Sequence, residues 1–183
     1  MRSVALASIL YCLASAALAA EGEPRIERLG AAAANGQVSV HFSLSNAFRG
    51  ETLESLQSGV PTSLTYVVEI FRDRPNWFDE GISRARIEVS AQFNSVTREY
   101  LLTYRRDRKL VKSQTFTDLA SLEKAMTMID EPNLFDIGNR RPYKMKVRAK
   151  ADLMRGWLLY FIPWEISTHW KEIRVTAPNE AKP

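Results

Sequence analysis

Cysteine is almost absent from this chain, because the only thiol among its 183 residues is Cys12. Cys12 lies inside the N-terminal apolar run, and the residue before it is not the small one that a lipid-attachment cysteine needs. If that run is removed, a disulfide framework, a thiol nucleophile and a cysteine-ligated zinc site are all excluded. The remaining chain is long enough to be stable without such cross-links, since it buries about two-thirds of its unfolded surface.

Long apolar runs are missing apart from the N-terminus, MRSVALASILYCLASAALAA, where one arginine precedes an uncharged stretch rich in Ala and Leu. The stretch ends in the small-residue pattern Ala17-Leu18-Ala19, which is typical of a secretory signal peptide. We therefore expect residues 1–19 to be a cleaved signal and the mature chain to have 164 residues (183 minus 19). The competing interpretation is an uncleaved inner-membrane anchor, for which Val4 to Ala20 is at the short end.

Charge of one sign is not in large excess, because the net charge is +4 and falls to about +3 when Arg2 is removed. Export also removes the usual target of basic clusters, so no nucleic acid partner is expected. Glycine-rich phosphate loops are missing, and so are the GxSxG, SxxK and HExxH motifs. The sequence therefore predicts no catalytic, cofactor-binding or metal-binding residues and no cofactor, and we expect a protein that is not an enzyme.

Histidine is also scarce, with His41 and His169 as its only two occurrences. We interpret both as surface or rim residues, since neither lies in a His-x-His pair or beside clustered carboxylates. A hydrolase or metal-binding protein that uses His41 or His169 remains the alternative.

Alternation of apolar and polar residues is the dominant pattern in the rest of the chain and predicts β-strands. Strands are expected over residues 37–46, 61–75, 82–93 and 143–154, in a hairpin over 97–116 with its turn near Arg106-Asp107, and over 164–170 with a bulge before Ile173 and Val175. A short helix is expected over 51–59, ended by Gly59, and a longer one over 117–129, capped by Thr117 or Asp118. Roughly seven strands and two helices favour a mainly antiparallel β-sandwich, with the immunoglobulin-like type as one option. The expected organisation is a leader over 20–35, the sandwich domain over 36–176 and a polar tail over 177–183.

The strand over 143–154 carries a ladder of cations at alternate positions on one face: Lys144, Lys146, Arg148 and Lys150. We interpret this basic ladder as a solvated sheet face that is partly paired with the carboxylates of neighbouring strands, Glu69, Glu88 and Glu99. The alternative is a docking face for an anionic partner. A second basic cluster, at the hairpin turn, contains Arg105, Arg106, Arg108 and Lys109. It is either a solvated turn or a contact for lipid phosphates or an acidic protein.

The segment GWLLYFIPW, residues 156–164, has no charge and contains four aromatic side chains: Trp157, Tyr160, Phe161 and Trp164. It is too short to span a bilayer. These aromatics either complete the core of the sandwich, dip into a membrane surface, or form a hydrophobic docking patch.

Two groups of residues carry a resemblance to a known family. Near the start these are Phe48, Gly59, Pro61, Trp77, Phe78 and Asp79, and near the end Pro163, Trp164, Ser167 and Trp170. Over residues 36–176 the chain resembles the proteobacterial secreted proteins catalogued as domain of unknown function 4390, with LQSGVP where that family has LESGVP. The resemblance implies no activity and no catalytic residues. It implies a periplasmic location and an envelope-interaction or signalling role, because the family's genes are associated with those of an envelope sensor histidine kinase.

The sequence therefore favours a non-enzymatic periplasmic protein that binds another envelope protein, such as the periplasmic region of a membrane sensor, or an anionic membrane surface. The candidate contacts are Trp77, Phe78, the basic ladder and the aromatics of 156–164. A sandwich that binds a small anionic ligand is a further alternative.

Overall fold

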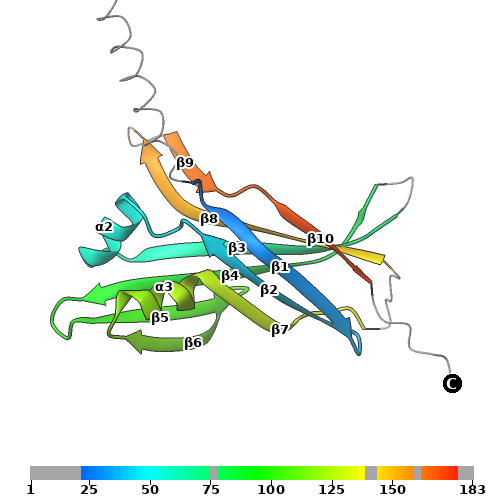
Figure 1. Ribbon diagram of the computed structural model, residues 1–183, viewed down its shortest axis with the longest axis horizontal. Coiled ribbons are helices and arrows are strands. Elements are labelled where there is room, and N and C mark those ends of the chain that lie inside the picture. The colour runs from blue at the N-terminus through cyan, green and yellow to red at the C-terminus, as the bar shows by residue number, and fades with distance from the viewer. Residues whose placement is uncertain (1–21, 75–77, 139–143, 159–161, 177–183) are drawn as a thin grey trace, which may run out of the picture.

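The computed structural model describes residues 22–74, 78–138, 144–158 and 162–176, which form two antiparallel sheets and two helices (Figure 1). The mainly β, antiparallel fold expected from the alternation is confirmed. In chain order the elements are β1 (Arg25–Ala34), β2 (Gln37–Ser45), α2 (Glu51–Gln57), β3 (Thr62–Arg72), β4 (Glu80–Asn94), β5 (Glu99–Arg106), β6 (Lys109–Phe116), α3 (Leu119–Thr127), β7 (Met128–Asp136), β8 (Lys144–Leu158), β9 (Ile162–Ser167) and β10 (Lys171–Thr176).

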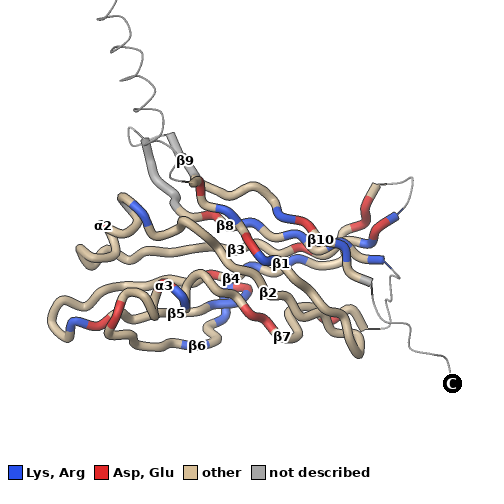
Figure 2. The backbone as a smooth tube through the Cα atoms, viewed as in Figure 1, with Lys and Arg blue, Asp and Glu red and all other residues tan. Residues whose placement is uncertain are grey.

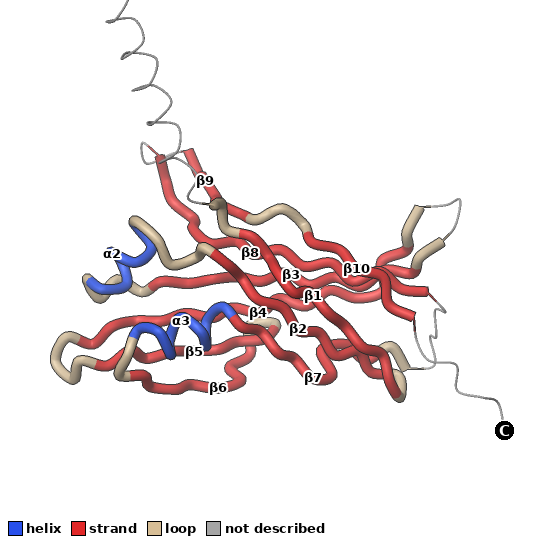
Figure 3. Tube along the Cα trace, viewed as in Figure 1, coloured by secondary structure: helices blue, strands red, loops and turns tan. Residues whose placement is uncertain are grey.

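The two sheets differ greatly in size. The smaller has the strand order β1-β2-β7, and the larger has seven strands in the order β10-β8-β3-β4-β5-β6, with β9 paired to β8 (Figure 3). The sheets of immunoglobulin-type sandwiches have three to five strands. Here the wide sheet extends beyond the small one, and α3 packs against β5 and β6 where the small sheet ends.

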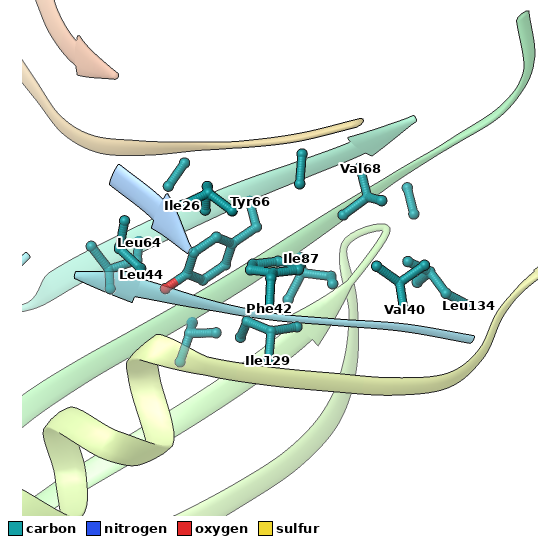
Figure 4. Packing of buried hydrophobic residues seen from close by; sticks show 14 of the residues in the cluster. Ile26, Val40, Phe42, Leu44, Leu64, Tyr66, Val68, Ile87, Ile129 and Leu134 are labelled. Carbon is teal, nitrogen blue, oxygen red and sulfur yellow. The ribbon is translucent and has the colours of Figure 1, made fainter. Parts of the chain in front are cut away.

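The core lies between the inner faces of the two sheets, as the alternating patterns predict. On β2 the buried side chains are Val38, Val40, Phe42 and Leu44, and on β8 they are Met145, Val147, Ala149 and Ala151. The rings of Phe42 and Tyr66 meet edge to face at 5.3 Å between centroids, so one aromatic pair joins the small sheet to the large one (Figure 4). The hydroxyl of Tyr66 donates to the carbonyl of Met126 at 2.8 Å and thereby fixes the end of α3.

The segment expected to be a leader contains β1, which pairs antiparallel with β2. Its run of four alanines favours a helix by intrinsic propensity, but pairing with β2 and burial of Ile26, Leu29 and Ala33 determine an extended backbone instead. The register shifts between Glu27 and Gly30, which is a bulge that obscures the period of two.

The longer helix is shorter than predicted. Asp118 is its N-cap and accepts a hydrogen bond from the Ser121 amide at 2.8 Å, as one of the two expected caps. The helix ends at Thr127, however, and Ile129 is buried in β7 instead of on the helix. Pro132 explains why the chain cannot continue as a helix, and as an edge strand β7 tolerates it.

The C-terminal strand predicted over 164–170 is two strands, β9 and β10, with residues 168–170 between them. β9 pairs antiparallel with the second half of β8, whereas β10 pairs antiparallel with the first half of β8. The change of phase that predicted a bulge is therefore a change of partner register along one long strand. Within the described residues, no helix has both the length and the apolar character needed to cross a bilayer.

Candidate functional site

The basic ladder lies on the outer face of the large sheet, where acidic and basic residues of β3, β8 and β10 alternate (Figure 2). Arg148 stands beside Glu69 in the register of β8 and β3. Its Nε and Nη2 atoms lie 2.8 and 2.7 Å from Oε2 of Glu69. The guanidinium also lies 4.4 Å from the ring centroids of both Phe71 and Trp170. Arg148 is thus engaged on three sides within the protein.

Glu69 is the central acid of this face, because it is only 9% exposed and also lies 3.4 Å from Nη1 of Arg84. We expect Glu69→Ala to lower the free energy of unfolding by about 1.5–3 kcal/mol, since it leaves the Arg148 guanidinium without its carboxylate. Arg84→Ala is the matched control: its side chain is 64% exposed, so the loss should be below about 1 kcal/mol. Urea denaturation of both variants measures the difference, and equal losses would contradict a central role for Glu69.

Lys146 ties the β3–β4 hairpin to β8. Its Nζ lies 2.9 Å from Oδ2 of Asp79 and 3.4 Å from Oδ1 of Asp73. The hydrogen bond from Lys146 lowers the pKa of Asp79, and the same bond raises the pKa of Lys146. Arg174 of β10 adds a second cation 3.4 Å from Oδ2 of Asp73. This cluster holds the two ends of the β3–β4 loop against β8 and β10.

Lys150 completes the paired part of the ladder, with its Nζ 2.9 Å from Oδ1 of Asp152 and 5.6 Å from the Trp170 ring centroid. Lys144 is exposed and forms no ion pair within the described parts of the chain. Of the expected partners, Glu69 does pair with the ladder, whereas Glu88 lies 3.5 Å from Arg105 instead. Because internal carboxylates hold most of the ladder, it has little charge left for a partner.

The aromatic candidates are only partly within the described residues. Phe78 is 89% exposed beside the hairpin cluster. Trp77, Tyr160 and Phe161 lie outside the described residues, as do residues 1–21 with the expected signal and residues 177–183 with the expected tail. The backbones of Trp157 and Trp164 belong to β8 and β9, paired with Pro163 and Gly156 respectively, and their side chains are outside the described part.

The two histidines lie in ordinary surroundings. His41 is exposed on β2, and its ring covers Gly30 of β1 so closely that a Cβ at Gly30 would lie 2.3 Å from Nε2. His169 is exposed between β9 and β10. Across the described ranges, no three His, Cys, Asp or Glu side chains form a group that could hold a metal ion. These observations do not specifically support a catalytic or metal-binding role for His41 or His169.

Comparison with known proteins adds one finding. The family described as Domain of unknown function (DUF4390) matches residues 21–174. The chain belongs to this family. The match of Domain of unknown function (DUF4390) begins before β1 and ends within β10, so it includes the strand that the leader interpretation left out. Searches of curated proteins and of solved structures each found no match.

The outermost strand of the large sheet, β6, is a feature that the sequence analysis did not identify as a site. β6 ends the strand order, and all its residues are exposed except the half-buried Phe116. Leu110 and Val111 are 63% and 53% exposed on it. The signal in the sequence is KLVKSQTF itself, a strand with two lysines and no acid.

The β5–β6 hairpin divides its basic cluster into paired and unpaired members. Arg105 lies 3.5 Å from Glu88, and Arg106 lies 3.0 Å from Glu131. Arg108 and Lys109 are exposed at the turn, and neither forms an ion pair among the residues that the structure describes. The hairpin thus has two paired arginines at the end of β5, directly before the turn, and unpaired cations at the turn and at the start of β6.

Proposed function

We propose that this domain is a non-enzymatic periplasmic interaction protein of the cell envelope, and that it binds an extended, acidic segment of another envelope protein along β6. The observation that carries the proposal is the open edge of β6. An edge strand presents a row of unpaired backbone N–H and C=O groups, to which another extended chain can add as a further strand. The exposed Leu110 and Val111 would supply apolar contacts to the added strand.

The positive charge of β6 and of the turn before it favours the addition of an acidic segment. Arg108, Lys109 and Lys112 are exposed along the tip and edge, and β6 contains no Asp or Glu. The Lys112 ammonium lies 5.1 Å from the Tyr104 ring centroid and forms no ion pair with any residue in the described ranges. Lysines on an edge strand oppose pairing with a second copy of the same chain. An acidic strand gains opposite-charge pairs, each worth roughly 0.2–1 kcal/mol.

The exported region of a membrane sensor is the partner that the family resemblance favours. An anionic membrane surface is the other candidate from the sequence. The ladder that would face it is largely paired internally: Lys146, Arg148 and Lys150 each contact carboxylates of their own sheet. The edge of β6 therefore supports a protein partner better than it supports a lipid surface.

Site-specific photo-crosslinking tests this proposal. A benzophenone amino acid at Val111 should crosslink one envelope protein in living cells, and mass spectrometry should place the crosslink in an extended segment rich in Asp or Glu. The same amino acid at Val96, which is 89% exposed at another turn, should not give this product. Capture at Val111 of a neutral or helical segment would contradict the proposal, and so would crosslinking to lipid.

Charge reversal provides the second half of the test. The triple variant Arg108→Glu, Lys109→Glu and Lys112→Glu should reduce the Val111 crosslink about tenfold or more, because three favourable cross-strand pairs become repulsive. The matched control reverses three exposed cations away from this edge, Arg49→Glu, Lys144→Glu and Lys171→Glu, and should leave the crosslink intact. Equal loss in both variants would indicate long-range attraction without docking at β6.

A further inference from the structure

A cavity of about 440 Å³ is lined by residues of α2, of the connection to β3, and of β3, β4 and β8. Its lining combines hydroxyl and charged side chains with three apolar residues, so polar and apolar surface are both present: Thr52, Ser55, Val60, Pro61, Thr62, Ser63, Thr65, Arg86, Glu88, Asp152 and Leu153. Cavities that bind small molecules in proteins have volumes of about 300–1,000 Å³. The volume is therefore sufficient for one small ligand, and the charged and hydroxyl side chains of the lining determine which polar groups it would need.

Register explains why residues so far apart in the sequence meet here. Thr65 of β3 is paired with Asp152 of β8 on one side and with Glu88 of β4 on the other. Directly paired residues on neighbouring strands point to the same face of a sheet. Two carboxylates therefore flank one hydroxyl across three strands and form the floor of the cavity.

Asp152 is the most informative group in this floor, because it is only 7% exposed. The ammonium of Lys150 lies 2.9 Å from its Oδ1, yet this oxygen accepts no hydrogen bond in the described structure. Lys150 therefore lies within hydrogen-bonding distance and balances the charge of the carboxylate, but its angle to Oδ1 is not that of a hydrogen bond. A buried oxygen in this condition costs free energy unless a donor reaches it. Because Oδ1 itself is closed to solvent, the carboxylate would turn on binding to accept a hydrogen bond from a ligand hydroxyl.

Arg86 adds a positive charge to the cavity, beside the two carboxylates of its floor. Its backbone N–H donates to Oδ1 of Asp107 at 2.9 Å, and its side chain lines the cavity. No ion pair of the Arg86 guanidinium occurs within the described ranges, whereas Glu88 is balanced by Arg105 and Asp152 by Lys150. The guanidinium is the uncompensated charge of the lining, and a planar carboxylate is its best-matched partner.

We infer that this cavity binds a small polyhydroxylated carboxylate, of the chemical class of the sugar acids. The ligand's carboxylate would pair with Arg86, and its hydroxyls would donate to Asp152 and Glu88. Thr65 and Ser63 would exchange hydrogen bonds with the same hydroxyls. This site is separate from the edge of β6 and its occupation is independent of the proposed protein partner.

Ligand-observed NMR with three probes tests the inference. D-Glucuronate, at concentrations up to about 10 mM, should receive saturation from the protein, with a dissociation constant of about 1 mM or lower. D-Glucose, which lacks the carboxylate, should bind about tenfold more weakly, and acetate, which lacks the hydroxyls, should not bind detectably. No transfer to glucuronate would overturn the inference, as would equal affinity for glucuronate and glucose.

Two variants assign the binding to the cavity. Arg86→Gln should weaken glucuronate binding about tenfold and leave glucose binding unchanged. Arg84→Gln is the matched control, since Arg84 lies on the same strand and face but does not line the cavity, and it should bind as the wild type does. Asp152→Asn, if it folds, should weaken both sugars. Unchanged glucuronate affinity in Arg86→Gln would overturn the site.

Discussion

Replacement of Phe42 by alanine should lower the free energy of unfolding by about 3–5 kcal/mol. Phe42 is 4% exposed at the centre of β2, and its ring meets Tyr66 of the large sheet edge to face at 5.3 Å (Figure 4). In the β2–β7 register it stands opposite Ile129, which is 2% exposed. Removal of the ring therefore leaves a cavity at the point where β2, β7 and the large sheet meet.

The effect is large because the total stability of a domain of this size is about 5–15 kcal/mol. Urea denaturation followed by circular dichroism should show a large decrease in the midpoint with an unchanged slope. Val111→Ala is the control, since Val111 is 53% exposed, and it should shift the free energy by no more than about 0.5 kcal/mol. A loss below about 1 kcal/mol for Phe42→Ala would mean that the small sheet contributes little to the core.

The strands that could be predicted from the sequence share one property, which is a polar outer face. On β8 the alternation of Lys146, Val147, Arg148 and Ala149 is regular because water or paired charge covers one side and the core covers the other. β1 lacks this contrast, since its second half is a run of alanines. A side chain that suits both faces and both conformations gives no period, so only the pairing with β2 determines the strand.

β7 was missed for a different reason. The spacing of Leu122, Met126 and Ile129 fits one helical face, and the first two are indeed buried on α3. Ile129 is buried as well, but on a strand that begins one residue after the helix ends. Local spacing predicts which residues are buried more reliably than it predicts the element that buries them, because several backbone paths can bring one apolar residue to the core.

The charged residues on the outer face of the large sheet show which contacts the alternation of residues in the sequence cannot predict. The sequence predicts the basic ladder and suggests Glu69 as a partner, since both depend only on the face of each strand. The lateral neighbours depend on register and on loops: Asp79 reaches Lys146 through the β3–β4 hairpin, and Trp170 reaches Arg148 from beyond β9. The cavity beside α2 likewise combines residues from α2, β3, β4 and β8. Nothing local in those segments predicts their meeting.

Stability should also fall steeply at alkaline pH because of two buried tyrosines. Tyr66 is 0% exposed and donates to the Met126 carbonyl, and Tyr104 is 4% exposed and donates to Oε1 of Glu131 at 2.5 Å. Burial raises the pKa of Tyr66 above its ordinary value. Burial, and then the hydrogen bond and negative charge of Glu131, raise the pKa of Tyr104 in the same direction.

The sign follows from proton counting. Above about pH 10 the tyrosines of the unfolded chain release their protons, whereas Tyr66 and Tyr104 in the folded chain retain theirs. The folded state then binds more protons than the unfolded state, so the free energy of unfolding decreases as the pH rises. Each tyrosine contributes up to about 1.36 kcal/mol per pH unit, and the two together about 2.7. Below pH 10 this contribution to stability is fully present.

Urea midpoints measured between about pH 8 and pH 12 test this dependence. Lys146 has a raised pKa and contributes in the same direction, so the comparison must be with variants that retain it. Tyr66→Phe should cost about 1–3 kcal/mol at pH 8, because the Met126 carbonyl loses its donor, yet it should reduce the alkaline slope by about 1.36 kcal/mol per unit. The wild-type and Tyr66→Phe stabilities should therefore converge as the pH rises. Parallel curves would show that Tyr66 ionises in the folded protein as readily as in the unfolded chain, and that its environment is not the closed core described above.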